Sequence, residues 1–149
     1  MKKIKLLVVM AALALVSAPC FADGLGYINY EKVLASYDLA KTVAKDLDAK
    51  GMEIQQYLMD REKEFKSIDT PVRQQAFKDK VAAEYKAKEE AYIKYRLNKE
   101  KEVFTKVQSA AKIIMAEQKL DAVVDIKAVF AGGVDITDIV IERLKGIKH

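Results

Sequence analysis

Two long stretches of the chain repeat apolar residues every three or four positions among many charged ones. In the first, residues 38–68, the spacings are four, seven, four, seven and three, at Val43, Leu47, Ile54, Leu58, Phe65 and Ile68. This spacing is a heptad stripe in which Gly51 and Arg61 take two seam positions. The second stretch, Pro71 to Lys119, has no further proline or glycine over 49 positions, so a helix there would be roughly 73 Å long. Both stretches are therefore predicted to be coiled-coil-like helices.

The residues between these stretches, SIDTPVR, predict a tight tip near residues 68–71 that joins two antiparallel helices. Pro71 suits the first turn of a helix, where its missing N–H needs no partner, and Asp69 or Thr70 can cap that turn. Folding the chain about the tip should pair residues whose numbers sum to about 139. The expected facing pairs are Leu47–Tyr92, Ile54–Tyr85 and Leu58–Val81.

The two ends of the chain carry the predictions of β structure. Short strands are expected at Leu25–Asn29, Ala122–Asp125 and Ala128–Phe130, which are rich in β-branched residues. A final helix should follow, with Asp135 as its cap, Asp138 completing a pair like a capping box, and Gly146 as its stop. Its apolar face is expected at Ile136, Ile139, Val140 and Leu144.

Three very short strands make a poor sheet with exposed edges, and oligomerisation would cover them. The second helix also outlasts the first, and its overhang, residues 103–114, is its most apolar part. The predicted fold is mainly α with a small β part. A long antiparallel helical hairpin, residues 38–102, stands on an oligomerisation body made of residues 23–37 and 103–149. The residues expected to form that body are Tyr27, Ile28, Val107, Ile114, Val123, Val124, Val129, Phe130, Ile136 and Ile139.

The first 22 residues are predicted to be a secretory signal peptide. Three lysines within the first five residues precede an apolar run from Leu6 to Val16, which is too short to span a bilayer. Small residues follow, and cleavage is expected after Ala22. Cys20 and Ala22 then occupy the two positions at which signal peptidase requires small residues. We expect the protein to be exported to the periplasm.

A lipoprotein with an acylated Cys20 is the alternative, although that chemistry prefers a leucine and a small residue where Ser17 and Pro19 stand. Cleavage removes this cysteine, the only one of the chain, and three of its 26 basic residues. The remaining chain has a net charge of about +1, so we do not expect a strong attraction to polyanions.

The motifs of enzymes and cofactor sites are not found in the sequence. The only histidine is His149, the last residue. Gly132-Gly133 indicates a turn rather than a phosphate loop. Asp135 and Asp138 could hold a cation, but capping explains them more simply. We therefore expect no catalytic residue, no cofactor and no metal site.

The chain resembles the Skp/OmpH family of periplasmic chaperones over the whole of residues 23–149. The motifs that carry the resemblance are GYIN with KVL at residues 26–34 and VVD, AV and DITD at residues 123–138. The resemblance implies a trimer with a small β body and three helical tentacles around a cavity. It also implies a holdase, a chaperone that binds unfolded outer-membrane proteins in this cavity and keeps them soluble without ATP. A transient contact with a membrane surface or lipopolysaccharide is a further implication, and no nucleic acid is expected.

A holdase needs many weak contacts on an adaptable surface. Tyrosines suit this task because they can touch apolar and polar groups alike. The residues expected to contact a client are Tyr57, Phe65, Phe77, Tyr95, Lys80 and Lys88. Two plainer interpretations stay open, in which the aromatic residues, Tyr85 and Tyr92 above all, fill the seam of the hairpin and the lysines belong to a salt-bridged helix face.

Two other functions are consistent with parts of the sequence. A structural spacer of the cell envelope would also need a coiled-coil rod with an assembly body. Its seam should be better filled than one interrupted at Gly51 and Arg61. A polyanion-binding module would use the basic residues of the second helix, and its binding should depend steeply on salt.

Overall fold

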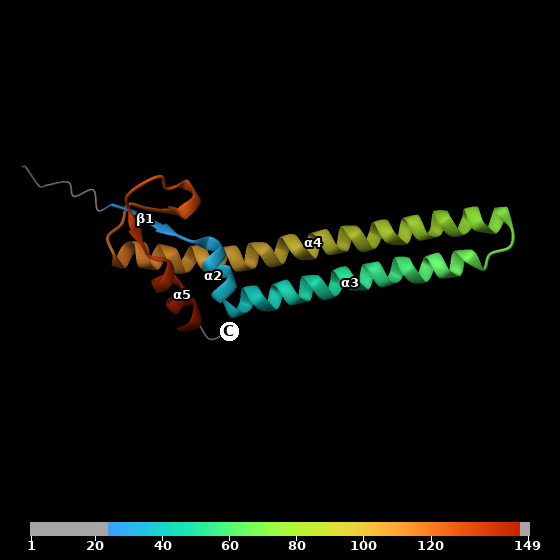
Figure 1. Cartoon of the computed structure of the whole chain (residues 1–149), viewed down its shortest axis with the longest axis horizontal. Helices are drawn as coiled ribbons and strands as arrows, with labels where there is room; N and C mark the ends of the chain where they lie inside the picture. The colour runs from blue at the N-terminus through green and yellow to red at the C-terminus, as the bar shows by residue number, and fades with distance from the viewer. Residues whose placement is uncertain (1–23, 147–149) are drawn as a thin grey trace, which may run out of the picture.

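The computed structural model describes residues 24–146. The predicted signal peptide and His149 lie outside the described residues. Figure 1 shows two long helices that run side by side from a small body at one end of the molecule. The fold is mainly α with a small β part, as the hydrophobic pattern predicts. Along the chain the elements are β1 (Leu25–Ile28), α2 (Tyr30–Ser36), α3 (Asp38–Lys66), α4 (Pro71–Glu117), β2 (Ala122–Asp125), the 3-10 turn η2 (Ile126–Ala128), β3 (Val134–Asp135) and α5 (Thr137–Gly146).

The long helices begin and end close to the residues where the sequence predicts them. α4 has 47 residues and is about 70 Å long at 1.5 Å per residue. Pro71 occupies its first turn and Thr70 its N-cap position, but the Thr70 side chain makes no capping hydrogen bond. The Gln74 amide instead donates to the carbonyl oxygen of Ile68 at 2.8 Å, which ties the tip to the first turn of α4.

The predicted pairing register of the hairpin is wrong by about one helical turn. Contacts across the seam join Tyr57 to Glu84, Phe65 to Phe77 and Lys50 to Tyr95. The numbers of these pairs sum to between 141 and 145 instead of 139. The cause is the tip, residues 67–70, which carries the chain past the end of α3 so that α4 begins farther out (Figure 1).

The sheet has three strands in the order β2-β1-β3, and both pairings are parallel. Parallel neighbours cannot be joined by a tight turn and need a long crossover connection. Between β1 and β2 that connection consists of α2 and the whole hairpin of α3 and α4. The arm is therefore an elongated crossover, and its two ends are anchored in adjacent strands.

The predicted strand at Ala128–Phe130 is wrong, whereas the other two strands form nearly as expected. After β2 the Asp125 carboxylate accepts the N–H of Lys127 at 2.8 Å and turns the chain into η2. Gly132 and Gly133 then take positive φ angles of 81° and 93°, which favour glycine. The third strand starts only at Val134, which pairs with Gly26.

The hydrophobic core lies at the body end, between α4, α5, α2 and the sheet. The core side chains are buried at Ile28, Val33, Tyr37, Val43, Val103, Val107, Ala110, Ala111, Ile114, Leu120, Ile136, Val140, Ile141 and Leu144. Of the predicted body residues, four are buried (Ile28, Val107, Ile114, Ile136), four are half-buried (Tyr27, Val123, Val124, Val129) and two are exposed (Phe130, Ile139). The apolar overhang of α4 is thus covered largely by elements of its own chain.

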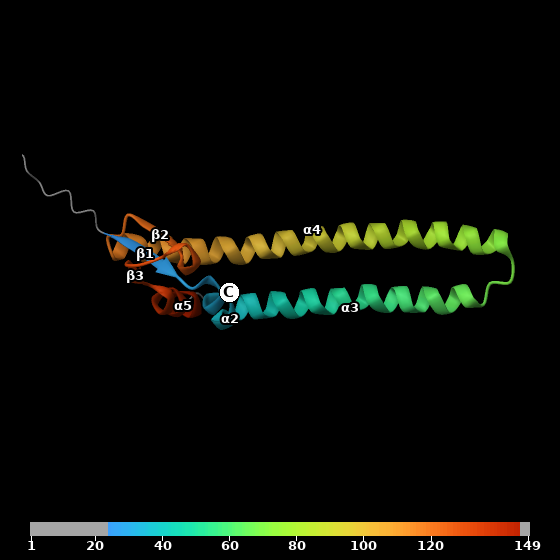
Figure 2. The ribbon, with the colours of Figure 1, turned by 45° about the horizontal axis from the view of Figure 1, so that its top comes forward.

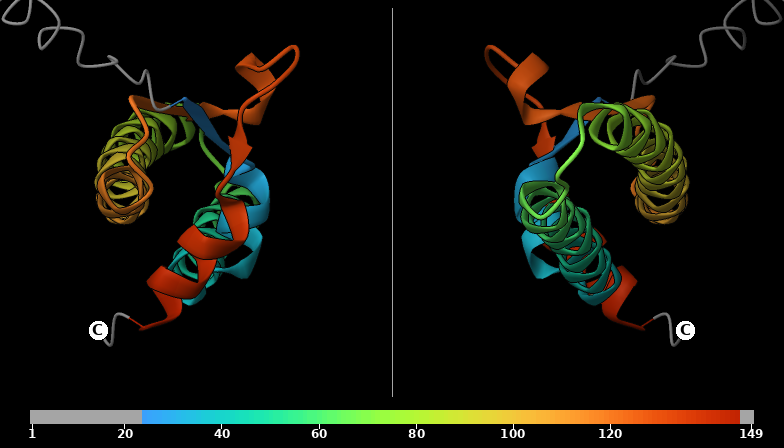
Figure 3. Two further views of the ribbon diagram at one scale, coloured as in Figure 1. Left: turned by 90° about the vertical axis from the view of Figure 1, so that its left-hand side faces the viewer. Right: turned by 90° about the vertical axis from the view of Figure 1, so that its right-hand side faces the viewer.

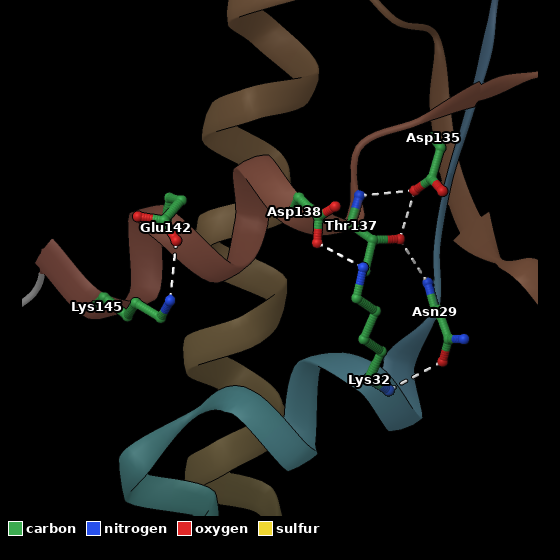
Figure 4. Close-up of polar contacts among 7 residues, drawn as sticks. All are labelled: Asn29, Lys32, Asp135, Thr137, Asp138, Glu142 and Lys145. Carbon is green, nitrogen blue, oxygen red and sulfur yellow. Dashed lines mark hydrogen bonds and ion pairs between the residues drawn. The ribbon is translucent and has the colours of Figure 1, made fainter.

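The last helix departs from the prediction in three details. Ile139 is 43% exposed and Ile141 is buried in its place, because the buried face of α5 consists of Thr137, Val140, Ile141 and Leu144. Asp138 does not complete a capping box but pairs with Lys32 of α2 at 2.7 Å (Figure 4). Gly146 belongs to α5 as its last residue instead of following it.

Candidate functional site

The arm is joined along its length only by half-buried side chains. Figure 2 shows α3 and α4 running beside each other as far as the tip. Val43 and Val103 are buried at its base, but no residue between these two positions is buried. A thin seam of this kind leaves apolar side chains partly open to solvent over most of the arm, where they can contact another molecule.

Tyr57 is at the centre of the contacts midway along the seam. Its hydroxyl donates to the Glu84 carboxylate at 2.6 Å. The cationic groups of Arg61 and Lys88 lie 5.5 and 4.9 Å from its ring centroid, within the range of cation–π attraction. The hydrogen bond raises the pKa of Tyr57 and lowers the pKa of Glu84, which favours a neutral phenol donating to a charged carboxylate.

The other predicted aromatic residues also lie in the seam. Phe65 and Phe77 meet near the tip with ring centroids 6.2 Å apart, and Lys78 lies 5.0 Å from the Phe65 centroid. Nearer the body, the Lys50 ammonium lies 4.8 Å from the Tyr95 ring centroid. These residues hold the two helices together with one side of each ring. Each residue stays partly exposed, so its position is compatible both with filling the seam of the hairpin and with contacting a client.

Four basic residues of α4, Lys80, Lys86, Arg96 and Lys99, pair with acidic residues about one turn away on the same helix. Examples are Lys80 with Glu84 at 3.9 Å and Arg96 with Glu100 at 3.7 Å. Such exposed pairs contribute little to stability. The interpretation of these residues as a salt-bridged helix face therefore applies to Lys80, while Lys88 points to the Tyr57 ring instead.

A large apolar groove lies where the arm meets the body, and the sequence did not single it out. It has a volume of about 870 Å³. Leu34, Leu47 and Leu97 line it, together with Tyr30 and Phe104, whose rings meet edge to face at 6.3 Å. Leu97 and Phe104 are 55% and 51% exposed. The sequence did show that the end of the second helix is apolar. Which of its residues stay uncovered depends on how the rest of the chain packs against it.

The groove and the seam of the arm offer mainly apolar contact. Among residues 24–146, no three acidic, histidine or cysteine side chains are grouped so as to hold a metal ion. None of the helices in this part of the chain is long and apolar enough to cross a membrane. The surface offers aromatic rings, aliphatic side chains and paired charges in alternation, which can touch many sequences without selecting one.

The fold is a long two-helix arm with a thin seam, carried on a small body with a parallel sheet. The sequence profile of a family described as outer membrane protein (OmpH-like) matches residues 24–144. The chain belongs to this OmpH-like, or Skp/OmpH, family, as its GYIN and DITD motifs indicated. No curated protein sequence matches the chain significantly.

One similar solved structure is a crystal structure from Caulobacter crescentus CB15, described as an outer membrane chaperone (OmpH-like). It is 17% identical in sequence and has a TM-score of 0.42. The match covers 81% of this chain and 83% of that one.

Proposed function

We propose that this protein is an ATP-independent holdase chaperone of the periplasm, which binds unfolded outer-membrane proteins between its helical arms until they insert into the membrane. Several copies, three by resemblance to the family, assemble through their bodies and place their arms around a shared cavity. Membership of the OmpH-like family supports this class of function.

The observation that carries the proposal is the absence of buried residues along the arm between Val43 and Val103. A rod built only as a spacer would gain stability from a filled seam, as coiled coils do. Here the seam instead presents half-buried aromatic and aliphatic side chains to solvent. A client can be held by many such weak contacts and released without an energy source.

The groove where the arm meets the body, lined by Leu34, Leu47 and Leu97, supports the same proposal. It is lined by apolar side chains of α2, α3 and α4 at the base of the arm, where the arms of an assembly would converge. The nearly neutral charge expected of residues 23–149 indicates that apolar contacts, not a general attraction to polyanions, supply most of the binding.

The proposal is tested by aggregation of a urea-unfolded outer-membrane β-barrel protein. The barrel protein is diluted into buffer without ATP, with increasing amounts of the protein made from the full chain, and light scattering is followed. We expect suppression that saturates near one assembly per client and that survives moderate salt.

Two results would contradict the proposal in different ways. Suppression that disappears as salt is raised would assign binding to the basic residues of α4. A folded oligomer that suppresses nothing at any dose would refute the chaperone function.

A further inference from the structure

Three lysines of the arm lie over aromatic rings of the opposite helix. In each pair one residue belongs to α3 and the other to α4. We call these three residues, Lys50, Lys78 and Lys88, the cover lysines. The pairs are Lys50 with Tyr95, Lys88 with Tyr57 and Lys78 with Phe65, and the ammonium nitrogen lies 4.8, 4.9 and 5.0 Å from the ring centroid.

The cover lysines differ from other lysines of the arm in what they contact. Lys63, Lys66 and Lys86 each pair with a carboxylate of their own helix, at 3.6, 2.8 and 4.0 Å. None of the ion pairs found among residues 24–146 includes a cover lysine. For these three ammonium groups an aromatic ring takes the place of a carboxylate partner.

Only side chains of the arm itself shield these rings. Figure 1 and Figure 3 show that, away from the body, no other described element lies against α3 or α4. Tyr57, Phe65 and Tyr95 are half-buried. A change in the position of a cover lysine therefore changes how much of its ring is open to another molecule.

The cover lysines also line two grooves of the seam. Lys50 and Lys88 line a groove of about 360 Å³ beside Tyr95, and Lys78 lines one of about 340 Å³ beside Phe65. The apolar or aromatic residues that complete them are Ile54, Ala91 and Tyr92 in the first, and Leu58, Phe77, Val81, Ala82 and Tyr85 in the second. A cover lysine that turns outward thus widens a groove whose remaining walls are mostly apolar.

The strength of these contacts suits a cover that must also open. A cation over an exposed ring is favoured only about two- to fivefold over the open arrangement. The lysine stem is long and flexible, so its ammonium group can leave the ring and stay in water. A bound apolar side chain can therefore displace the lysine easily, whereas rings left without cover would add to the exposed apolar surface through which proteins aggregate.

We propose that the cover lysines shield the aromatic rings of the arm while the protein is empty and turn outward when a client binds, so that apolar side chains of the client take their place over the rings. The inference rests on the proposed holdase function and assigns these lysines a role opposite to electrostatic capture. They restrain client binding instead of promoting it.

The direct test follows the lysine ε-CH₂ protons by NMR in protein made from the full chain. Ring currents shift protons above an aromatic face upfield, so the cover lysines should give signals upfield of those of Lys63 and Lys86. Saturation with an unfolded outer-membrane barrel protein, diluted from urea, should return these signals to the ordinary position. Signals that are not upfield in the empty protein, or that stay upfield in the complex, overturn the proposal.

A second test compares two variants that lose the same charge. The cover variant carries Lys50→Gln, Lys78→Gln and Lys88→Gln, since glutamine keeps polarity and helix propensity. We expect it to bind the uncharged dye Nile red at least twofold more strongly than the control, and the unfolded barrel protein at least threefold more tightly. Equal values, or weaker client binding by the cover variant, overturn the proposal. The control variant carries Lys63→Gln, Lys66→Gln and Lys86→Gln.

A loosened arm would also expose the rings, and a third variant separates this case. Arginine at the three cover positions keeps a cation that stacks on aromatic faces, so dye binding should stay at or below the native value. Dye binding above that value overturns the proposal. Circular dichroism reports the helix content of each variant, and if the glutamine variant loses helix, the proton shifts of the native protein decide.

The failures of this proposal and of the proposed function can be told apart. If the native protein suppresses aggregation and the cover variant behaves as its control, the role of the lysines is overturned and the holdase proposal stands. If the native protein suppresses no aggregation, the holdase function is refuted. The ε-CH₂ signals and the dye binding of the empty protein then still decide whether the lysines shield the rings.

Discussion

At the scale of single residues, Thr137 joins two distant parts of the chain. It is 2% exposed, the one buried polar side chain among the described residues. Its hydroxyl accepts the N–H of Asn29 at 2.9 Å, and its own N–H donates to the Asp135 carboxylate at 2.9 Å (Figure 4). The bonds from Thr137 lower the pKa of Asp135. Through this one side chain the start of α5 is fastened to the end of β1.

We expect Thr137→Val to destabilise the protein by about 1–3 kcal/mol, because it keeps the volume of the side chain but leaves the Asn29 N–H without its acceptor. Urea unfolding at a fixed protein concentration measures the change, since stability of an oligomer depends on concentration. Thr105→Val is the matched control. The Thr105 hydroxyl bonds only to the Lys101 carbonyl of its own helix, and its loss should cost less than about 0.5 kcal/mol. Equal costs for the two variants would refute the role of Thr137.

At the scale of elements, the arm combines long helices with weak lateral contact. Gly51 illustrates the balance, because it lies inside α3 at a seam position and an added Cβ would meet nothing within 4 Å. Glycine in a helix interior costs about 1 kcal/mol relative to alanine. No packing requires this glycine, so its effect is to loosen the middle of the arm.

Gly51→Ala should therefore stabilise α3 by up to about 1 kcal/mol. Hydrogen exchange of the amides around residue 51 should slow by up to about fivefold, the factor that this free energy gives. Gly26→Ala is the opposite control, because a Cβ there would lie 2.7 Å from the Leu120 Cδ1 atom and should destabilise the body. Unchanged exchange around residue 51 would show that the glycine does not limit the stability of the arm.

At the scale of the whole molecule, stability and binding surface are separated along the long axis. Among residues 24–146, the buried apolar side chains lie within residues 28–43 or 103–144, and the arm between them contributes none. The body closes around the parallel sheet and holds both ends of the crossover. The arm can therefore vary in length and sequence without loss of the core.

Removing residues 51–64 and 78–91 tests this separation. The deletion takes two heptads from each helix, preserves the tip and the phase of the seam, and shortens the arm by about 21 Å. We expect the body to keep its fold and its association state by circular dichroism and sedimentation. The dose needed to suppress aggregation of a barrel protein should rise several-fold. Undiminished suppression would place client binding on the body or the base of the arm.

The sequence by itself determined the elements that depend on local interactions. The heptad stripe, the proline at position 71 and the lack of breakers after it placed the two long helices, and the GYIN and DITD motifs indicated the family. Propensity and periodicity act over a few neighbouring residues, so they can be read without the fold.

Only the tertiary structure decided how these elements meet. The path of four tip residues moved the seam by a turn, and the parallel pairing of β1 placed the third strand at Val134 instead of Ala128. The packing of these elements against one another leaves Ile139 and Phe130 exposed and leaves a groove beside Leu97. Each of these outcomes depends on contacts between residues far apart in the chain, whose geometry no local pattern contains.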